Sequence, residues 1–323
     1  MTRFLPLLAL AIALLQSPAA MADSARLNID PDRITVSGVS AGAQMAHQMH
    51  IAYSDIFNGG AMIAGGPFGC AEGSLAIAMG RCVGTADPDF PMGEQLEMIR
   101  SAAKAGKLAP LDNLSDDPVW LFHGALDTAV ASGVSDQLAE LYETLIPNGS
   151  IVYETTIEAG HSFPAKGQGT ECNVLEAPYV ADCDYDAAGA LLQHLYPGLK
   201  APAAEVTTVL TPVALHGAVD AGLSETAYLF IPAKCEEGED ACALHLVLHG
   251  CAQSAVQIET GFMLQSGYLP WAEANHIVLA FPQTVPGVTN PLGCWDWWGY
   301  TGADYLYRDG KQMTVLAEWI ESL

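Results

Sequence analysis

The chain alternates between short apolar runs with strand character and longer segments whose apolar residues recur at helical spacing. Strands separated by helices are typical of a mostly parallel sheet with helices on both faces, so the pattern predicts an α/β fold. The predicted strands span residues 34–37, 60–63, 119–122, 151–157, 207–213, 226–231, 244–248 and 277–280. The predicted helices span residues 44–53, 93–105, 134–145, 187–195, 312–322 and the surroundings of 271–274.

The segment 196–205, with two prolines and three alanines, has the composition of a connector. It is too short to mark a domain boundary by itself, and the chemical features described below are divided between its two sides. We therefore expect residues 23–323 to form a single catalytic domain.

The first 22 residues are typical of a cleaved signal peptide. Arg3 precedes an apolar run over residues 4–15, and the small-residue pattern Ala20-Met21-Ala22 stands just before Asp23. The unbroken apolar run is shorter than the roughly 20 residues that a membrane-spanning helix needs. The sequence therefore predicts a secreted protein, extracellular or periplasmic, without stable insertion in a membrane.

The charge balance narrows the range of partners. Twelve Lys and Arg residues against 37 Asp and Glu residues give a formal net charge of −25, which repels phosphate backbones and anionic lipid surfaces. Nucleic acid is therefore not expected as a partner. Half of the residues are apolar, which suffices for a large core and excludes a disordered chain.

The eight cysteines of an exported chain would meet an oxidising environment, in which disulfides persist. Three pairs of close neighbours suggest local loops, namely Cys70 with Cys82, Cys172 with Cys183, and Cys235 with Cys242. The remaining two, Cys251 and Cys294, would then join distant segments. No CxxC pair or histidine cluster has the spacing of a zinc site, so we expect structural disulfides and no metal site.

The most informative stretch is residues 34–45, where a short strand meets the pattern Gly38-x-Ser40-x-Gly42 and a helix follows. This context is typical of a nucleophile elbow, in which a serine occupies a sharp, strained turn. The two glycines remove side chains that would collide, and the helix offers its N-terminal N–H groups. We predict Ser40 as the nucleophile; a Gly- and Ser-rich turn without catalytic function is the alternative.

A serine hydroxyl is a weak nucleophile at its ordinary pKa, so it needs a general base and an acid that orients this base. Asp127 follows the predicted strand 119–122, and His161 follows the predicted strand 151–157. The order serine, acid, histidine agrees with that of α/β-hydrolases. We predict Asp127 as the acid and His161 as the base, with His123 bracing the loop that carries Asp127.

Acyl transfer also needs two hydrogen-bond donors for the tetrahedral oxyanion. The N–H of Ala41, next to Ser40, is the first. The second normally comes from a loop before the elbow, but the fitting strand and loop, 244–248 followed by His249-Gly250-Cys251, come late in this chain. This inversion predicts a circularly permuted chain whose two ends lie close together, with segment 196–205 as the new connection.

These stretches together resemble the secreted, single-domain, circularly permuted poly(3-hydroxybutyrate) depolymerases of the fungal type, a family of α/β-hydrolases. The resemblance rests on residues 36–45, 63–67, 70, 123–127, 160–161, 248–253 and 294–299, which span nearly the full mature length. It implies Ser40, Asp127 and His161 as the catalytic triad and the N–H groups of Ala41 and Cys251 as oxyanion donors. It also implies that Cys251 pairs with Cys294.

Half of the chain's six tryptophans, Trp295, Trp297 and Trp298, stand within four residues. Core packing is one interpretation, because tryptophan is largely buried on average. The other is an apolar wall that binds a methyl-bearing polyester without many hydrogen-bond donors. We predict these rings as substrate-binding residues, with at least one of them facing the substrate.

The sequence thus predicts a secreted serine esterase that hydrolyses poly(3-hydroxybutyrate) or its oligomers through an acyl-enzyme, without a metal or organic cofactor. A feruloyl or acetylxylan esterase is the first alternative, because such secreted hydrolases share a similar His-Gly-Cys loop and Cys-Trp segment. A catalytically silent polymer-binding protein with the same fold is the second, although the triad is complete in the sequence.

Overall fold

The computed structural model of the protein describes residues 26–87, 90–236, 238 and 241–323, so the predicted signal peptide, residues 1–22, lies outside the described part. Eight strands form one large sheet: β1 (Ile29–Val39), β2 (Gly60–Ile63), β3 (Val119–Phe122), β4 (Ile151–Glu154), β8 (Leu210–Ala214), β9 (Thr226–Phe230), β10 (Cys242–Leu248) and β11 (Ile277–Phe281). Each corresponds to one of the eight predicted strands.

Most of this sheet is parallel. Its spatial order is β4-β3-β2-β1-β10-β11-β9-β8, and the six strands from β4 to β11 pair in parallel. The two remaining strand pairs of this sheet, β11 with β9 and β9 with β8, are antiparallel. The carboxyl ends of the six parallel strands therefore share one edge, where loop side chains can meet.

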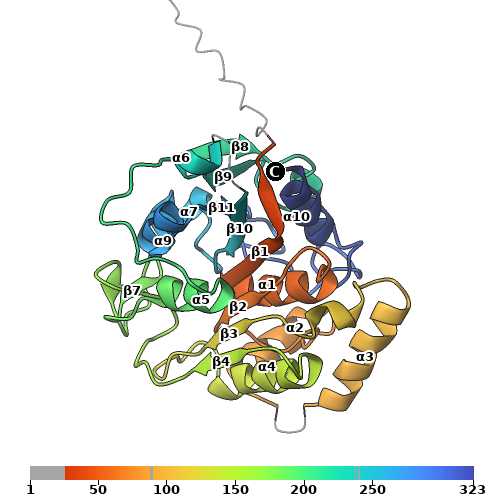
Figure 1. Cartoon of the computed structure of the whole chain (residues 1–323). Coiled ribbons are helices and arrows are strands. Elements are labelled where there is room, and N and C mark those ends of the chain that lie inside the picture. The colour runs from red at the N-terminus through yellow and green to blue at the C-terminus, as the bar shows by residue number, and fades with distance from the viewer. Residues whose placement is uncertain (1–25, 88–89, 237, 239–240) are drawn as a thin grey trace, which may run out of the picture.

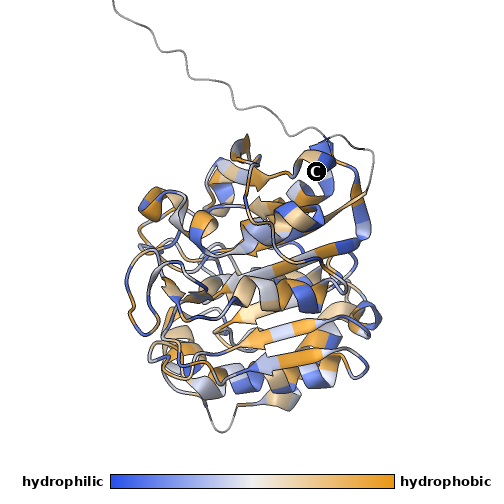
Figure 2. Ribbon diagram, turned by 60° about the vertical axis from the view of Figure 1, so that its left-hand side comes forward, coloured by the Kyte–Doolittle hydropathy of each residue, from blue (hydrophilic) through white to orange (hydrophobic). Residues whose placement is uncertain are grey.

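Helices cover both faces of the sheet (Figure 1). On one face lie α1 (Ala41–Ala52), α3 (Met92–Lys104), α4 (Ser132–Leu145) and α10 (Lys311–Ser322), and on the other α5 (Ala187–Leu195), α8 (Gly261–Gln265) and α9 (Tyr268–Asn275). Successive strand residues point to opposite faces of the sheet. Met62 therefore packs in the core on the side of α1, and Ala61 packs in the core on the side of α5. Figure 2 shows hydrophobic residues concentrated on the central strands.

The structure confirms the permuted order of the chain. The strand β1 comes first in the sequence but lies in the middle of the sheet, between β2 and β10. The Leu27 N–H donates to the Leu323 carbonyl, so the start of the described chain touches the end of α10 (Figure 1). The segment between α5 and β8 connects the two halves, as expected for residues 196–205.

Several short elements escaped the sequence analysis. A small sheet of β5 (Phe163–Ala165), β7 (Val180–Asp182) and β6 (Thr170–Glu171) follows His161, and α2 (Leu75–Met79) continues into a π-helical turn over Gly80–Gly84. The short helices α6 (Ala233–Glu236), α7 (Ala255–Ile258) and α8 were not predicted either, nor were the 3₁₀ turns at Leu111–Leu114 and Val219–Ala221. Such elements are too short to show a period in the sequence.

All eight cysteines form disulfides, in the four predicted pairs: Cys70–Cys82, Cys172–Cys183, Cys235–Cys242 and Cys251–Cys294. Three of them close loops of 7 to 12 residues in sequence separation, and the fourth spans 43. Among the described residues, no helix has both the length and the apolarity that crossing a membrane requires.

His47 and His245 are among the histidines that are completely buried in the core. The ring nitrogens of His245 in β10 lie 2.6 Å from Thr35 Oγ1 and 2.7 Å from Ser37 Oγ. The ring of His47 in α1 packs between aromatic rings, and neither of its nitrogens has a hydrogen-bond partner in the described part of the chain. Burial lowers the pKa of both histidines to about 3, because apolar surroundings disfavour the charged imidazolium.

We expect the protein to lose stability as the pH falls below about 6.5. In the folded state both histidines stay neutral down to about pH 3, whereas in the unfolded chain each binds a proton below about pH 6.5. Proton binding stabilises the unfolded chain, so the free energy of unfolding falls by about 1.4 kcal/mol per pH unit for each histidine. Urea unfolding at about pH 7 and about pH 5 measures this loss. His47→Leu should remove one histidine's share of the pH dependence, and an unchanged pH dependence in this variant would contradict the prediction.

Candidate active site

The turn between β1 and α1 has the strained geometry of a nucleophile elbow. Ser40 adopts φ 56° and ψ −119°, a conformation that is costly for any residue except glycine. A Cβ on Gly38 would lie 2.1 Å from Gly42 O, and a Cβ on Gly42 would lie 2.2 Å from Leu248 O. Because both contacts are with backbone, the two glycines are required at these positions.

Ser40, His161 and Asp127 meet at the carboxyl edge of the sheet. His161 Nε2 lies 2.9 Å from Ser40 Oγ, and His161 Nδ1 lies 2.7 Å from Asp127 Oδ2. An ionised carboxylate can only accept a hydrogen bond, so Nδ1 carries the ring proton and Nε2 is left to accept from the serine hydroxyl. In this geometry the imidazole can remove the serine proton.

The surroundings of Asp127 keep its carboxylate ionised. The side chain is 1% exposed, and its Oδ1 accepts from the N–H groups of Ala129 at 2.8 Å and Val130 at 2.9 Å. Burial by itself would raise the pKa of this carboxyl, but the hydrogen bond and charge of His161, helped by the two backbone donors, lower it below its ordinary value. The negative charge is thus retained beside His161.

His123 supports the loop that carries Asp127. Its Nε2 lies 2.9 Å from the Val130 carbonyl, which can only accept, so this nitrogen donates. The same nitrogen is 3.9 Å from Asp127 Oδ2, too far for a hydrogen bond. The bracing role expected for His123 agrees with this position.

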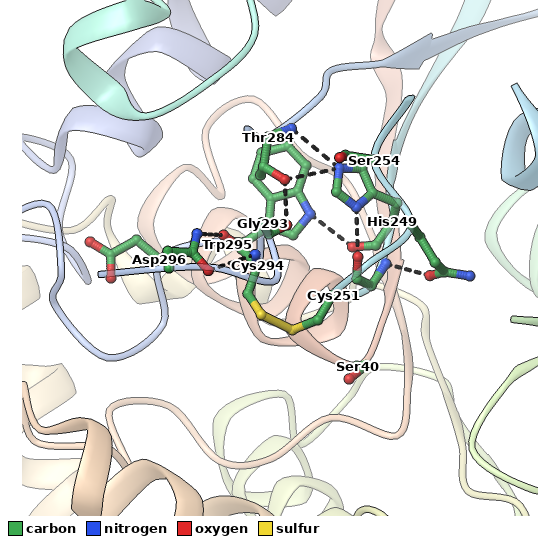
Figure 3. Close-up of a disulfide and its surroundings, with 12 residues drawn as sticks. Ser40, His249, Cys251, Ser254, Thr284, Gly293, Cys294, Trp295 and Asp296 are labelled. Atoms are coloured by element: carbon green, nitrogen blue, oxygen red, sulfur yellow. Dashed lines mark hydrogen bonds between the residues drawn. A yellow bond between two sulfur atoms is a disulfide. The ribbon is translucent and has the colours of Figure 1, made fainter. Parts of the chain in front are cut away.

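Two backbone N–H groups stand close to Ser40. Ala41 is the first residue of α1, where an N–H has no acceptor within the helix. Cys251 follows β10, and a Cβ on the preceding Gly250 would lie 3.5 Å from Ser40 Cβ. Figure 3 shows the Cys251–Cys294 disulfide directly above Ser40. The two predicted oxyanion donors thus come from opposite ends of the chain to one place.

Two cavities border this group of residues, and both are lined by Ser40, His161, Cys251 and Leu292. The larger, of about 400 Å³, has an almost entirely apolar lining. The smaller, of about 240 Å³, extends toward Leu175, Tyr179 and Gln253. Several residues of the larger cavity were not predicted from the sequence, because they stand on short elements or a turn without a recognisable period: Leu75, Met79, Val83 and Leu292.

The three clustered tryptophans have different environments. Trp297 and Trp298 line the larger cavity. Trp295 is fully buried, and its Nε1–H donates to the His249 carbonyl at 2.8 Å. Trp295 lines neither of the two cavities; its indole ring supports the loop before Cys251 from the inside.

Comparisons with known proteins identify relatives of the chain, although no protein-family model matches it. The chain is 38% identical over 300 residues to a poly(3-hydroxybutyrate) depolymerase of Delftia acidovorans, covering 91% of this chain and 60% of that relative. It is 31% identical over 315 residues to a polyhydroxybutyrate depolymerase of Talaromyces funiculosus, covering 92% of this chain and 91% of the relative. The chain thus spans about three fifths of the first relative's length and nearly all of the second.

Solved structures give the same result. The crystal structure of a PHB depolymerase from Penicillium funiculosum superposes with a TM-score of 0.85 at 31% identity, over 94% of this chain and 98% of that one. A serine-to-alanine variant of a PHB depolymerase in complex with an R3HB trimer superposes with a TM-score of 0.86 at 30% identity and the same coverage.

The permuted sheet, the strained serine turn and the aligned imidazole and carboxylate define an α/β-hydrolase. Similarity over more than nine tenths of the chain and of its Talaromyces relative narrows this class to one family. The chain belongs to the poly(3-hydroxybutyrate) depolymerase family, which confirms the resemblance seen in the sequence.

We expect a fluorophosphonate probe to label Ser40, and we expect Asp127→Asn to slow this labelling by a factor of about 10⁴. An amide beside His161 can hold the ring in the wrong tautomer and cannot stabilise the imidazolium. Intact-protein mass spectrometry over time gives both rates, and thermal unfolding shows whether the variant is folded. Equal labelling rates in two folded proteins would refute the role assigned to Asp127.

Proposed function

We propose that the protein is a secreted serine esterase that hydrolyses poly(3-hydroxybutyrate) or its oligomers. The observation that carries this proposal is the line of hydrogen bonds from Asp127 through His161 to Ser40 at the mouth of an apolar cavity. Two curated relatives named for this polyester, and a related structure that holds an R3HB trimer, support the substrate class.

The proposed location and domain organisation follow the sequence. Residues 1–22 act as the signal peptide, and residues 23–323 act as one catalytic domain. Four disulfides support export, because such bonds persist in oxidising compartments.

Acylation starts when His161 Nε2 takes the proton of Ser40 Oγ and the serine oxygen attacks the ester carbonyl carbon. The N–H groups of Ala41 and Cys251 stabilise the resulting oxyanion. Asp127 stays ionised and stabilises the imidazolium of His161. His161 then returns its proton to the leaving hydroxyl oxygen, the C–O ester bond breaks, and an acyl group remains on Ser40.

Deacylation repeats these steps with water. His161 Nε2 removes a proton from a water molecule, and the hydroxide oxygen attacks the acyl carbon. The same two N–H groups stabilise the second oxyanion. Breakdown of this intermediate releases a hydroxy acid and restores the Ser40 hydroxyl with the proton that His161 held. No metal or organic cofactor takes part in these steps.

The lining of the larger cavity suits a polyester better than a polysaccharide ester. A 3-hydroxybutyrate chain presents methyl groups and ester oxygens along its length and no hydroxyl except at its end. Sugar hydroxyls would need polar partners, whereas Leu75, Met79, Val130, Trp297 and Trp298 offer almost none. The feruloyl or acetylxylan esterase alternative lacks such support in this cavity.

Ser40→Ala should abolish clearing of emulsified poly(3-hydroxybutyrate) while leaving the thermal unfolding transition in place, because the substitution removes only the attacking oxygen. The wild-type protein should clear this polymer and hydrolyse methyl ferulate much more slowly. A clearing assay and a ferulate assay on the same preparation measure both. Clearing by the Ser40→Ala variant, or faster ferulate hydrolysis by the wild type, would reject the proposal.

Trp298→Ala should lower kcat/KM for a soluble 3-hydroxybutyrate trimer by about tenfold, because the variant loses apolar contact area along the cavity. Trp298→Phe is the matched control, since it keeps an aromatic ring and should lose much less. Hydrolysis followed by product chromatography gives both values. Equal values in all three proteins would show that Trp298 does not contact the substrate.

A further inference from the structure

A buried histidine lies directly behind the proposed oxyanion site. His249, the first residue after β10, is 1% exposed. Trp295 Nε1–H donates to its carbonyl at 2.8 Å, and the two rings pack with centroids 5.2 Å apart. Figure 3 shows the imidazole between Thr284 and the loop of Cys251, with Ser40 beyond the disulfide. The ring is thus fixed in place by residues from distant parts of the chain.

Only one protonation state of the His249 ring satisfies its neighbours. Nδ1 lies 2.7 Å from the Gly250 carbonyl, which can only accept, so Nδ1 carries a proton. Nε2 lies 3.3 Å from the Thr284 N–H, which can only donate, so Nε2 is unprotonated. The Thr284 hydroxyl donates to the Gly293 carbonyl instead. Burial lowers the pKa of His249 to about 4, which keeps the ring neutral.

The hydrogen bond from Nδ1 acts on the peptide group that contains the Cys251 N–H. The Gly250 carbonyl and the Cys251 N–H belong to the same planar trans peptide, so they point in opposite directions. Besides His249, the Gln253 N–H binds this carbonyl, at 3.3 Å. The Cys251 N–H itself has no acceptor within the part of the chain that the structure describes. The direction of the carbonyl therefore sets the direction of the free donor.

The disulfide alone cannot set this direction. The Cys251–Cys294 bond restrains the Cα of Cys251, but a peptide plane can rotate between two Cα atoms that stay in place. A rotated plane would turn the Gly250 carbonyl oxygen toward Ser40. This oxygen would repel the negative charge that the ester carbonyl develops.

We propose that His249 is a positioning residue: its Nδ1–H holds the Gly250 carbonyl so that the Cys251 N–H points at the oxyanion. The same hydrogen bond polarises the peptide and strengthens its N–H as a donor. This inference rests on the proposed esterase function, in which Cys251 supplies one oxyanion donor.

Two substitutions of His249 distinguish the contribution of Nδ1 from that of Nε2. The amide of His249→Asn can place an N–H where Nδ1 stands, whereas the amide of His249→Gln reaches only the position of Nε2. We expect His249→Gln to lower kcat for a soluble p-nitrophenyl ester by about 30- to 100-fold with little change in KM, because a misdirected donor fails only in the transition state. His249→Asn should keep kcat within about threefold of wild type.

Equal losses in the two variants, a larger loss in His249→Asn, or full kcat in His249→Gln would overturn the inference. Ester hydrolysis by the wild type and its loss in Ser40→Ala test the proposed function separately. An active wild type with variants that do not differ would therefore reject only the role of His249.

A measurement on the wild-type protein covers the case in which a variant does not fold. In ¹⁵N-histidine-labelled protein, the His249 resonances, identified by their contacts with the Trp295 ring, should show a proton on Nδ1 and none on Nε2. A boronic acid that forms a negatively charged tetrahedral adduct with Ser40 should shift the Nδ1–H resonance. The opposite tautomer, or an Nδ1–H resonance that does not respond to the adduct, would overturn the inference.

Discussion

The close approach of the first turn of α1 to the end of β10 is the constraint on which the site depends. A Cβ on Gly42 would lie 2.2 Å from the Leu248 oxygen and 2.4 Å from the His249 oxygen, so only glycine permits this contact. The parallel register that pairs Gly38 with Leu248 brings the two segments to the same level. Ser40 and the loop of Cys251 are therefore neighbours, although some two hundred residues separate them in the sequence.

This contact also explains why a permuted chain can carry the same site. The arrangement requires that β1 and β10 be neighbours in the sheet, and it does not depend on which strand comes first in the sequence. The backbone hydrogen bond between Leu27 and Leu323 holds the two ends of the described chain together. The loop after β10, which carries His249 and Cys251, is held by the Cys251–Cys294 disulfide and by the indole of Trp295. The disulfide and the buried indole thus hold the loop of Cys251 beside Ser40.

Much of this arrangement can be predicted from the sequence, because strand patterns and turn residues are local. All eight strands of the large sheet were expected, and the strand ends placed Asp127 and His161 at one edge. Tertiary contacts decided the rest. The fourth strand ends at Glu154 rather than residue 157, because the Ile157 carbonyl accepts from the Ala125 N–H in the acid loop. Likewise, Trp295 turns inward to bind the His249 carbonyl, a partner 46 residues away that no local pattern reveals.

The central claim is that Ser40 takes the acyl group from the ester in one step and carries it until water cleaves the acyl-enzyme in a second. Rapid quenching of the protein with an activated 3-hydroxybutyrate ester, followed by peptide mapping in the mass spectrometer, tests this most directly. The expected result is one 3-hydroxybutyryl group, attached to Ser40, that forms and disappears at rates consistent with turnover. Acylation of a different residue, or turnover with no acyl group on the protein at any time, would contradict the account.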